Sequence, residues 1–229
     1  MEKKDIRISV SKDGPYIVSG QVPIQEKIIE SDKDGNSIKW KDGKKFKCDG
    51  SCALCRCGNS LTKPFCSGMH AKIGFKGDET ANNIPYNKRA AVTEGKDIIL
   101  KDVKELCASA RFCDPDDGTW ELTKKSDIPE CKKLALQQAC DCPSGRLVMC
   151  DKKTGKDIEP KFEKSIGVVE DPSRKASGPL WIRGGIQVES ASGKEYEVRN
   201  RMTLCRCGKS KNKPFCDGSH LVEEFETKE

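Results

Sequence analysis

The sequence is short of the side chains that build large apolar cores and of those that perform acid–base chemistry. Aromatic residues make up 6% of the 229 residues, and there are only two histidines. Eighteen apolar residues never follow one another, so no segment has the composition of a membrane-spanning helix. The first residues also lack the apolar core of a signal peptide, so we expect a soluble, cytoplasmic protein.

Charge is plentiful but not concentrated. Lys and Arg number 42 against 36 Asp and Glu, and the basic residues are spread along the whole chain. A nucleic-acid-binding protein usually gathers basic residues in a patch, with aromatic residues among them. We therefore interpret the lysines as a solvated surface, and we expect neither nucleic acid nor a membrane as a partner.

Cysteine is the abundant residue of special chemistry. The 14 cysteines are about 6% of the chain, below the roughly 8–10% typical of disulfide scaffolds. In a reducing cytoplasm, grouped thiols usually hold metals or do redox work. Small modules that are poor in large apolar side chains also tend to need a bound metal or a disulfide in order to fold.

A sixteen-residue pattern occurs twice and contains both histidines. Residues 55–70 read CRCGNSLTKPFCSGMH, and residues 205–220 read CRCGKSKNKPFCDGSH. Four soft or borderline ligands repeated at one spacing predict a metal site, with iron–sulfur and zinc as the candidates. The ligands of the two copies, spaced Cys-x-Cys-x8-Cys-x3-His, are Cys55, Cys57, Cys66 and His70, and then Cys205, Cys207, Cys216 and His220.

The surroundings of the two motifs repeat as well. Residues 14–20 and 178–184 share the pattern Gly-Pro-x-x-(Val/Ile)-x-Gly, which predicts a strand entered through a turn. The proline before each third cysteine suits the first position of a short helix. Such a helix would put Cys66 and His70, and the equivalent pair of the second copy, on one helical face. The glycine after each Cys-x-Cys would let the backbone turn closely around the ligands.

With these residues the sequence resembles the CDGSH iron–sulfur family. The resemblance implies a [2Fe–2S] cluster in each motif, held by the three cysteines and the histidine. It also implies two modules that pair about a twofold axis, here within one chain. The second copy carries the Cys-Asp-Gly-Ser-His motif intact, whereas the first reads Cys-Ser-Gly-Met-His. Loss of the aspartate predicts that the two clusters differ in potential and lability.

The histidine ligand would set the reduction potential and the acid lability of these clusters. Neutral imidazole in place of an anionic thiolate raises the reduction potential, and protonation of the imidazole competes with ligation. We therefore expect acid-labile clusters that release electrons, or whole clusters, on the sides of His70 and His220. A Cys3His zinc site is the main alternative, although zinc fingers usually separate paired ligands by more than the one residue of Cys-x-Cys; a disulfide framework is another.

The segment between the motifs has a different character. Its sequence predicts alternating elements, with strands at 97–100, 119–122 and 146–150 and helices at 102–110 and 130–139. Bacterial ferredoxins use Cys-x2-Cys-x2-Cys with a distant Cys-Pro. This β-α-β-α-β segment resembles a single-cluster ferredoxin in which Ala110 replaces the second cysteine. The ligands that remain, which match those of a [3Fe–4S] cluster, are Cys107, Cys113 and Cys142.

Other interpretations of the middle segment stay open. They are a [4Fe–4S] cluster with a further ligand, a ferredoxin-like domain without a cluster, and zinc; Cys140 is also an alternative ligand. Cys131 and Cys150 fit small buried hydrophobes. Cys48 and Cys52 could be a redox-active pair, an auxiliary site or ordinary packing residues.

We expect an α+β protein of three parts. A β-rich CDGSH module at 1–80 and another at 166–229 would form an intramolecular pseudo-dimer, and a ferredoxin-like βαβ-type domain would occupy 90–165. The expected function is one-electron transfer to redox partner proteins by a monomer with an internal pseudo-twofold. The alternatives are cluster storage or transfer to apo-acceptors, redox or pH sensing, and a structural zinc protein. We expect no enzymatic activity, because both histidines belong to the repeat and no phosphate-binding glycine pattern occurs.

Overall fold

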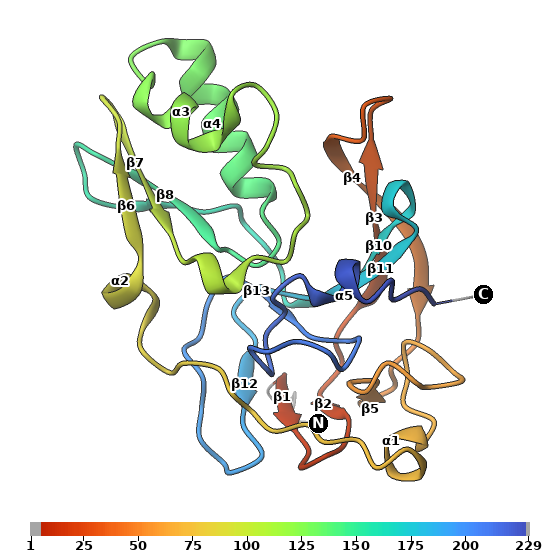
Figure 1. Ribbon diagram of the computed structural model, residues 1–229. Helices are drawn as coiled ribbons and strands as arrows, with labels where there is room; N and C mark the ends of the chain where they lie inside the picture. The colour runs from red at the N-terminus through yellow and green to blue at the C-terminus, as the bar shows by residue number, and fades with distance from the viewer. Residues whose placement is uncertain (1–5, 228–229) are drawn as a thin grey trace.

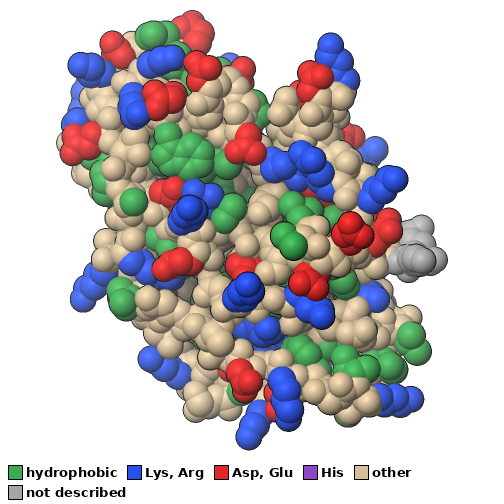
Figure 2. All heavy atoms as spheres, viewed as in Figure 1, with side chains coloured by type: hydrophobic (Ala, Val, Ile, Leu, Met, Phe, Trp, Pro, Cys, Tyr) green, Lys and Arg blue, Asp and Glu red, His purple; other side chains and the backbone are tan. Residues whose placement is uncertain are grey.

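The computed structural model describes residues 6–227, which form three β-sheets flanked by short helices (Figure 1). The protein is α+β, as expected, and strands dominate it. On the face drawn in Figure 2, basic and acidic side chains are interspersed rather than separated by sign. No helix within residues 6–227 has the length and apolarity needed to cross a membrane.

The first sheet lies at the lower end of Figure 1 and has the order β12-β1-β2-β5. Alternation of buried and more exposed residues along β1 and β2 gives the sheet one core-facing side. Three strands come from the N-terminal segment, but β12 comes from the C-terminal one and pairs in parallel with β1. The bounds are β1 Arg7–Val10, β2 Tyr16–Ser19, β5 Ser51–Leu54 and β12 Gln187–Glu189.

The second sheet has five strands in the order β13-β11-β10-β3-β4 and also combines both outer segments. Here β3 of the N-terminal segment pairs in parallel with β10 of the C-terminal one. Each outer segment thus supplies strands to the sheet of the other. The bounds are β3 Ile24–Ser31, β4 Ser37–Phe46, β10 Ser165–Asp171, β11 Ala176–Arg183 and β13 Arg201–Leu204.

One hydrophobic core joins these two sheets. Fully buried side chains from both segments meet in it, and each stabilises the fold by about 1.5–3 kcal/mol relative to an exposed position. The Tyr16 hydroxyl crosses from the first sheet and donates to the carbonyl oxygens of Cys205 (2.8 Å) and Pro214 (3.0 Å). Core residues with 0% exposure include Tyr16, Val18, Leu54, Ile166, Leu180 and Leu204.

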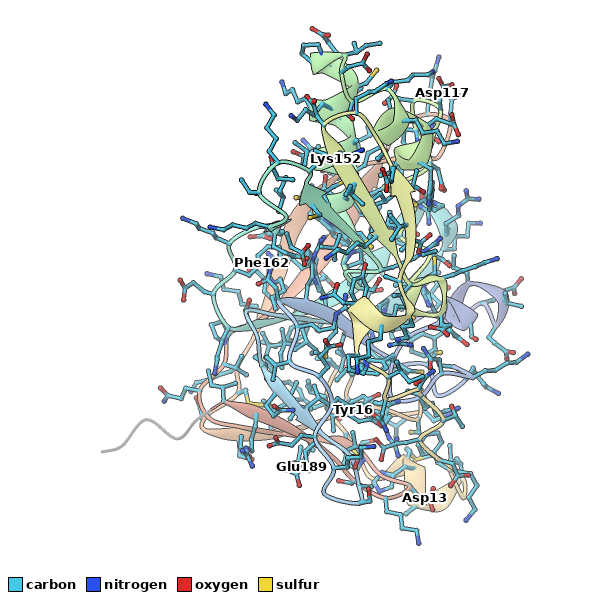
Figure 3. All side chains as sticks on the ribbon, turned by 90° about the vertical axis from the view of Figure 1, so that its left-hand side faces the viewer. Asp13, Tyr16, Asp117, Lys152, Phe162 and Glu189 are labelled. Carbon is cyan, nitrogen blue, oxygen red and sulfur yellow. A yellow bond between two sulfur atoms is a disulfide. The ribbon has the colours of Figure 1, made fainter. Side chains whose placement is uncertain are left out.

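The middle segment forms the third sheet, in the order β6-β7-β8-β9, with two helices packed on it. In Figure 3, Asp117 and Lys152 of this segment lie at the opposite end of the molecule from Asp13. The bounds are β6 Ala91–Glu94, β7 Ile98–Asp102, α3 Gly118–Lys124, α4 Pro129–Asp141, β8 Leu147–Asp151 and β9 Asp157–Ile158. Further short elements are α1 Met69–Lys72, α2 Tyr86–Arg89, the 3-10 turn η1 Lys104–Leu106, the 3-10 turn η2 Pro172–Arg174 and α5 Ser219–Val222.

Two predicted elements of the middle segment are wrong. The helix expected at 102–110 is only the turn η1, and an irregular loop follows in which Ser109 and Arg111 have φ of 54° and 60°. The strand expected at 119–122 is helix α3, whose buried positions 118, 119, 122 and 123 have helical spacing. The order is therefore two strands, two helices and two strands, not an alternating β-α-β-α-β; the predicted strands at 97–100 and 146–150 and the helix at 130–139 are confirmed.

Candidate iron–sulfur centres

Each repeated motif forms a loop that folds back on the strand before it. The Cys55 amide donates to the Pro64 carbonyl, and the Cys66 amide donates to the Ala53 carbonyl, both at 2.8 Å. The second loop makes the equivalent bonds at 2.8 and 2.9 Å. Two bonds of this kind hold the first and third cysteines of each motif beside one another.

The four predicted ligands of each motif lie in two close pairs. In the first loop, Cys55 Sγ is 3.9 Å from Cys57 Sγ, and Cys66 Sγ is 3.3 Å from His70 Nδ1. In the second loop the corresponding distances are 3.7 and 3.5 Å. Both histidines therefore turn Nδ1 toward a ligand thiol.

Two pairs of donors fit a two-iron cluster in which each iron takes two protein ligands, as in Rieske centres. Among residues 6–227, no three or more His, Cys, Asp or Glu side chains are arranged around a single metal ion. Three thiols and one imidazole are soft and borderline donors suited to iron–sulfur chemistry. The residues present fit the cluster that the resemblance implies.

The predicted helical positions of the ligands are wrong in detail. Pro64 and Pro214 follow cis peptide bonds and lie outside any helix. The helices begin only after the third cysteine, α1 at Met69–Lys72 and α5 at Ser219–Val222. The cysteine and histidine still meet, because the tight turn at Gly68 or Gly218, with φ of 80° or 85°, reverses the chain between them.

The two loops touch one another at their Cys-x-Cys turns. Gly58 and Gly208, both at φ 79°, adopt a conformation that favours glycine. A Cβ on Gly58 would lie 2.5 Å from the Cys207 carbonyl oxygen, and a Cβ on Gly208 would lie 2.7 Å from that of Cys57. The expected close turn is confirmed, and the same glycines allow the two sites to approach.

Burial separates the two sites electrostatically. His220 is 4% exposed and Cys216 is 2% exposed, whereas His70 and Cys66 are only partly buried. Burial, with the nearby Arg206 charge, lowers the pKa of His220 to about 4. A shared hydrogen bond lowers the pKa of Cys205 to about 6 and raises the pKa of Cys207, so Cys205 is the thiol of this pair that loses its proton first.

The aspartate that only the second motif retains organises its loop. Asp217 accepts hydrogen bonds from the Lys211 amide (2.8 Å) and from the Ser219 amide (3.0 Å) and hydroxyl (2.6 Å). In the first loop, Ser67 Oγ accepts only the equivalent of the first bond, from the Leu61 amide at 3.0 Å. The first loop therefore keeps part of the network that holds the second.

Sequence reasoning missed the arginine between the first two cysteines of each motif. Arg56 is 1% exposed and donates to the carbonyls of Ser11, Gly14 and Gly77 at 2.8–3.0 Å. Arg206, 2% exposed, donates to the Gly178 and Val169 carbonyls and pairs with Glu170 at 2.8 Å. The same arginine occurs in both copies of the Cys-Arg-Cys sequence, and this repetition could have identified it as a structural residue.

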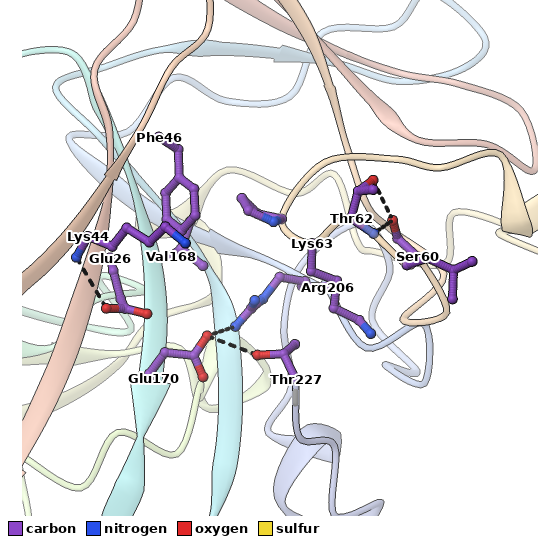
Figure 4. A pocket seen from close by; sticks show the side chains of 12 residues that line it. Glu26, Lys44, Phe46, Ser60, Thr62, Lys63, Val168, Glu170, Arg206 and Thr227 are labelled. Atoms are coloured by element: carbon purple, nitrogen blue, oxygen red, sulfur yellow. Dashed lines mark hydrogen bonds and ion pairs between the residues drawn. The ribbon is translucent and has the colours of Figure 1, made fainter. Parts of the chain in front are cut away.

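A groove of about 420 Å³ lies between the first loop and the second sheet (Figure 4). Ser60, Thr62 and Lys63 form one wall, and the Arg206–Glu170 pair forms the other. The groove contains none of the predicted ligands, so it flanks the centres and does not enclose one.

The structure brings the three predicted cysteines of the middle segment together. Cys107, Cys113 and Cys142 line one small cavity, and Ala110 lies on its wall where a fourth thiol would be expected. None of the amides from 108 to 113 donates to a backbone carbonyl of residues 6–227. Amides without a backbone acceptor are available to bind an anion, and Arg146, which pairs with Asp102 at 2.7 Å, also lines the cavity.

The other cysteines are placed elsewhere. Cys140 lines a different surface hollow, so the cavity contains Cys142 instead. Cys150 is 5% exposed and Cys131 packs against the core of the middle segment, which confirms the expected packing roles. Cys48 and Cys52 form a disulfide.

The middle segment covers the second site but leaves the first open. A Cβ on Gly218 would clash with the Ser109 side chain and lie 3.5 Å from the Cys107 carbonyl oxygen. A Cβ on the equivalent Gly68 would meet no atom of residues 6–227 within 4 Å. Arg201 of β13 also contacts the middle segment, because its guanidinium donates to the Cys142 carbonyl at 2.8 Å.

Comparison with known proteins agrees with these placements. The family described as "Iron-binding zinc finger CDGSH type" matches residues 13–71 and 177–221, and the family described as "Divergent 4Fe-4S mono-cluster" matches 93–152. Human "CDGSH iron-sulfur domain-containing protein 3, mitochondrial" is 30% identical over 81 residues, which are 35% of this chain and 59% of that protein. The chain thus spans little more than half of that relative's length, and no solved structure matches it. Two segments of the chain thus match the CDGSH-type family, and the segment between them matches a divergent 4Fe-4S mono-cluster family, which supports an iron–sulfur protein.

Proposed function

We propose that this protein transfers single electrons between protein partners through three iron–sulfur centres. The two CDGSH-type sites would each hold a [2Fe–2S] cluster on three cysteines and one histidine, and the middle segment would hold a third cluster. When bound, the clusters supply reversible one-electron redox chemistry. The polypeptide contributes ligands, buried surroundings and the contacts that keep the centres adjacent.

The observation that carries this proposal is the contact between consecutive sites. The loop with Cys107 and Ser109 lies on Gly218 of the second site, and the second loop meets the first at Cys57 and Cys207. A series of adjacent centres suits electron passage, whereas a single catalytic site would not need it. For the same reason we assign no enzymatic activity.

For the middle segment we propose a [3Fe–4S] cluster on Cys107, Cys113 and Cys142. Three thiols line its cavity, and the fourth position holds Ala110. The matching family is described by a 4Fe-4S cluster, so the number of irons is the point to measure.

For the outer segments we propose an internal pseudo-dimer. The exchange of β3 and β12 between the two sheets supports it, as does the mutual contact of Gly58 and Gly208. The module boundaries that we propose, at 80, 90 and 165, divide the sequence into three segments. They do not divide the fold into separate units, because strands of the first segment pair with strands of the third. A cytoplasmic location also stays a prediction, and the name of the human relative states a mitochondrial one.

Cluster transfer to an apo-acceptor is a second candidate function. The open surroundings of Gly68, together with the partial exposure of Cys66 and His70, favour it at the first site. If this candidate is correct, the first cluster should pass to an apo-ferredoxin while the second stays bound.

The test is the metal content of anaerobically purified protein, with EPR spectra before and after dithionite. We expect about seven irons per chain and an oxidised-state signal from the [3Fe–4S] centre. About eight irons with signals only after reduction would replace that centre by [4Fe–4S], and about four would leave the middle segment as a scaffold. Zinc without iron would overturn the proposal.

A further inference from the structure

The turn between β4 and β5 carries a covalent difference between the two outer segments. Cys48 and Cys52 are joined by a disulfide with Cα atoms 5.7 Å apart, while the other twelve cysteines are free thiols. Cys205 follows Cys55 by 150 residues, and at the same spacing Cys48 and Cys52 correspond to Val198 and Met202. The second segment therefore repeats the structure without the disulfide.

The disulfide lies where another protein can reach it. The neighbouring side chains of Lys47 and Asp49 are 85% and 73% exposed, and both cysteines are partly exposed. At Gly50, the tip of the turn, an added Cβ would meet nothing within 4 Å. Both cysteines also pack against the hydrophobic core on their inner side, so a thiolate would approach the disulfide from the exposed side of the turn, as exchange requires.

From Cys52 the chain leads directly to the first cluster site. Cys52 lies in β5 opposite Val18 of β2. The next residue, Ala53, accepts the hydrogen bond from the Cys66 amide at 2.8 Å. Leu54 then forms a β-bridge with Phe65, the residue before Cys66. The position of one cluster ligand thus depends on the start of β5.

The other end of the disulfide reaches the same ligand from β4. Phe46, at the end of β4, packs edge-on against Phe65, with ring centroids 6.3 Å apart. The second segment has the same contact between Tyr196 and Phe215, at 5.2 Å. The disulfide therefore links the end of β4 to the start of β5, the two strands that contact the loop before Cys66. The second site has no such link.

We propose that Cys48–Cys52 is a thiol–disulfide exchange site for a dithiol partner protein, and that its state sets how firmly the first cluster site is held. A partner thiolate attacks one sulfur, the S–S bond breaks, and the other sulfur leaves as a thiolate that takes up a proton. The partner's second thiol then attacks the mixed disulfide. Both cysteines of this chain end as thiols, and the partner ends as a disulfide.

After reduction, the start of β5 is held by its ladder to β2, by the bond from the Gly20 amide to the Gly50 carbonyl and by the packing of Cys52 on the core. The Ala53 acceptor and the Phe46 contact can then move apart, so the first cluster should be lost faster. The exchange itself is independent of the clusters, whereas this effect rests on the proposed [2Fe–2S] centre at Cys55, Cys57, Cys66 and His70.

The exchange is tested by counting thiols in the full-length holoprotein. Protein treated anaerobically with oxidised or reduced dithiothreitol is denatured in an alkylating reagent, and the mass gives the number of thiols. We expect twelve after oxidation and fourteen after reduction, and no difference in the double variant Cys48→Ser with Cys52→Ser. A reduced thioredoxin-type protein should produce the same change. Fourteen thiols under both conditions would overturn the exchange site.

The effect on the first site is tested by the rate at which a chelator bleaches the clusters. Pre-reduction should accelerate one kinetic phase several-fold, and His70→Cys should identify it as the first site by slowing it. The matched control moves the disulfide: Val198→Cys with Met202→Cys, in the Cys48→Ser, Cys52→Ser background, should transfer dithiol sensitivity to the second phase. Sensitivity of both phases alike, or of neither, would overturn the link to the first site. The iron content measured before treatment distinguishes this outcome from a protein that never contained the clusters.

Discussion

The two CDGSH-type sites have the same four ligands, the same loop and the same backbone bonds, yet their surroundings differ. The second site is closed by Ser109 of the middle segment and keeps Asp217. The first site has open space at Gly68 and has a serine in place of the aspartate. The comparison teaches that ligand identity sets what a site can bind, whereas the neighbouring elements set how exposed and how stable the site is.

The strongest expected effect is on the buried arginine of the second site. Arg206→Met removes the ion-pair partner of Glu170 and a donor to the Gly178 and Val169 carbonyls, so the free energy of unfolding should fall by about 3–5 kcal/mol. Urea unfolding and iron content measure the change. The control is Arg7→Met, because the Arg7–Glu189 pair is partly exposed and contributes less than about 1 kcal/mol. Equal effects of the two variants would contradict this.

A matched glycine pair tests the cover over the second site. Gly68→Ala and Gly218→Ala both put alanine in the left-handed region, at a cost of about 1–3 kcal/mol each. Only Gly218→Ala also pushes Ser109 away, which should add about 1–3 kcal/mol. Urea unfolding compares the two. Ser109→Gly should remove the extra cost, and no rescue would mean that the contact is not the cause.

Replacement of each histidine by cysteine tests how burial changes the redox properties. An added thiolate charge should lower the potential of the altered cluster by on the order of 100 mV. The shift should be larger for His220→Cys than for His70→Cys, because the buried site is less screened by water. EPR-monitored redox titration measures both. A larger shift at the exposed site would reverse the comparison.

The smallest effect is expected from the missing aspartate. Ser67→Asp with Met69→Ser restores the full motif and should slow chelation of the first cluster by about 10-fold. The reciprocal change, Asp217→Ser with Ser219→Met, should accelerate chelation of the second. Bleaching of the cluster absorbance measures both rates. If neither rate moves, the difference between the sites comes from the cover alone.

The ligand sets could be predicted because spacing and residue type carry them directly. Eight residues separate Cys57 from Cys66, and the structure places the four candidate ligands of the loop in two close pairs. In the middle segment the three candidate thiols also lie at one cavity. The strand expected at 119–122 failed because Thr119 and Trp120 favour strands locally, whereas burial of Thr119, Leu122 and Thr123 favours the helix.

What could not be predicted depends on contacts between distant parts of the chain. Nothing local in the sequence says that Ser109 would lie on Gly218 or that Arg201 would hold the Cys142 turn. Such contacts follow from how three sheets pack, which a pattern of short segments does not encode. The asymmetry between the two sites was expected from the aspartate, but its larger cause, the middle segment, was not.

The exchange of strands between the outer segments has a consequence for how this protein can change. Because β3 and β12 each complete the other segment's sheet, pairing of the halves depends on their effective concentration within one chain and not on the concentration of protein. Dilution cannot separate them. In an assembly of two identical subunits, every substitution appears in both sites, whereas here each half can mutate alone. An aspartate in one half alone, a disulfide in the other half alone and a cover over one site are differences that a pair linked in one chain can carry.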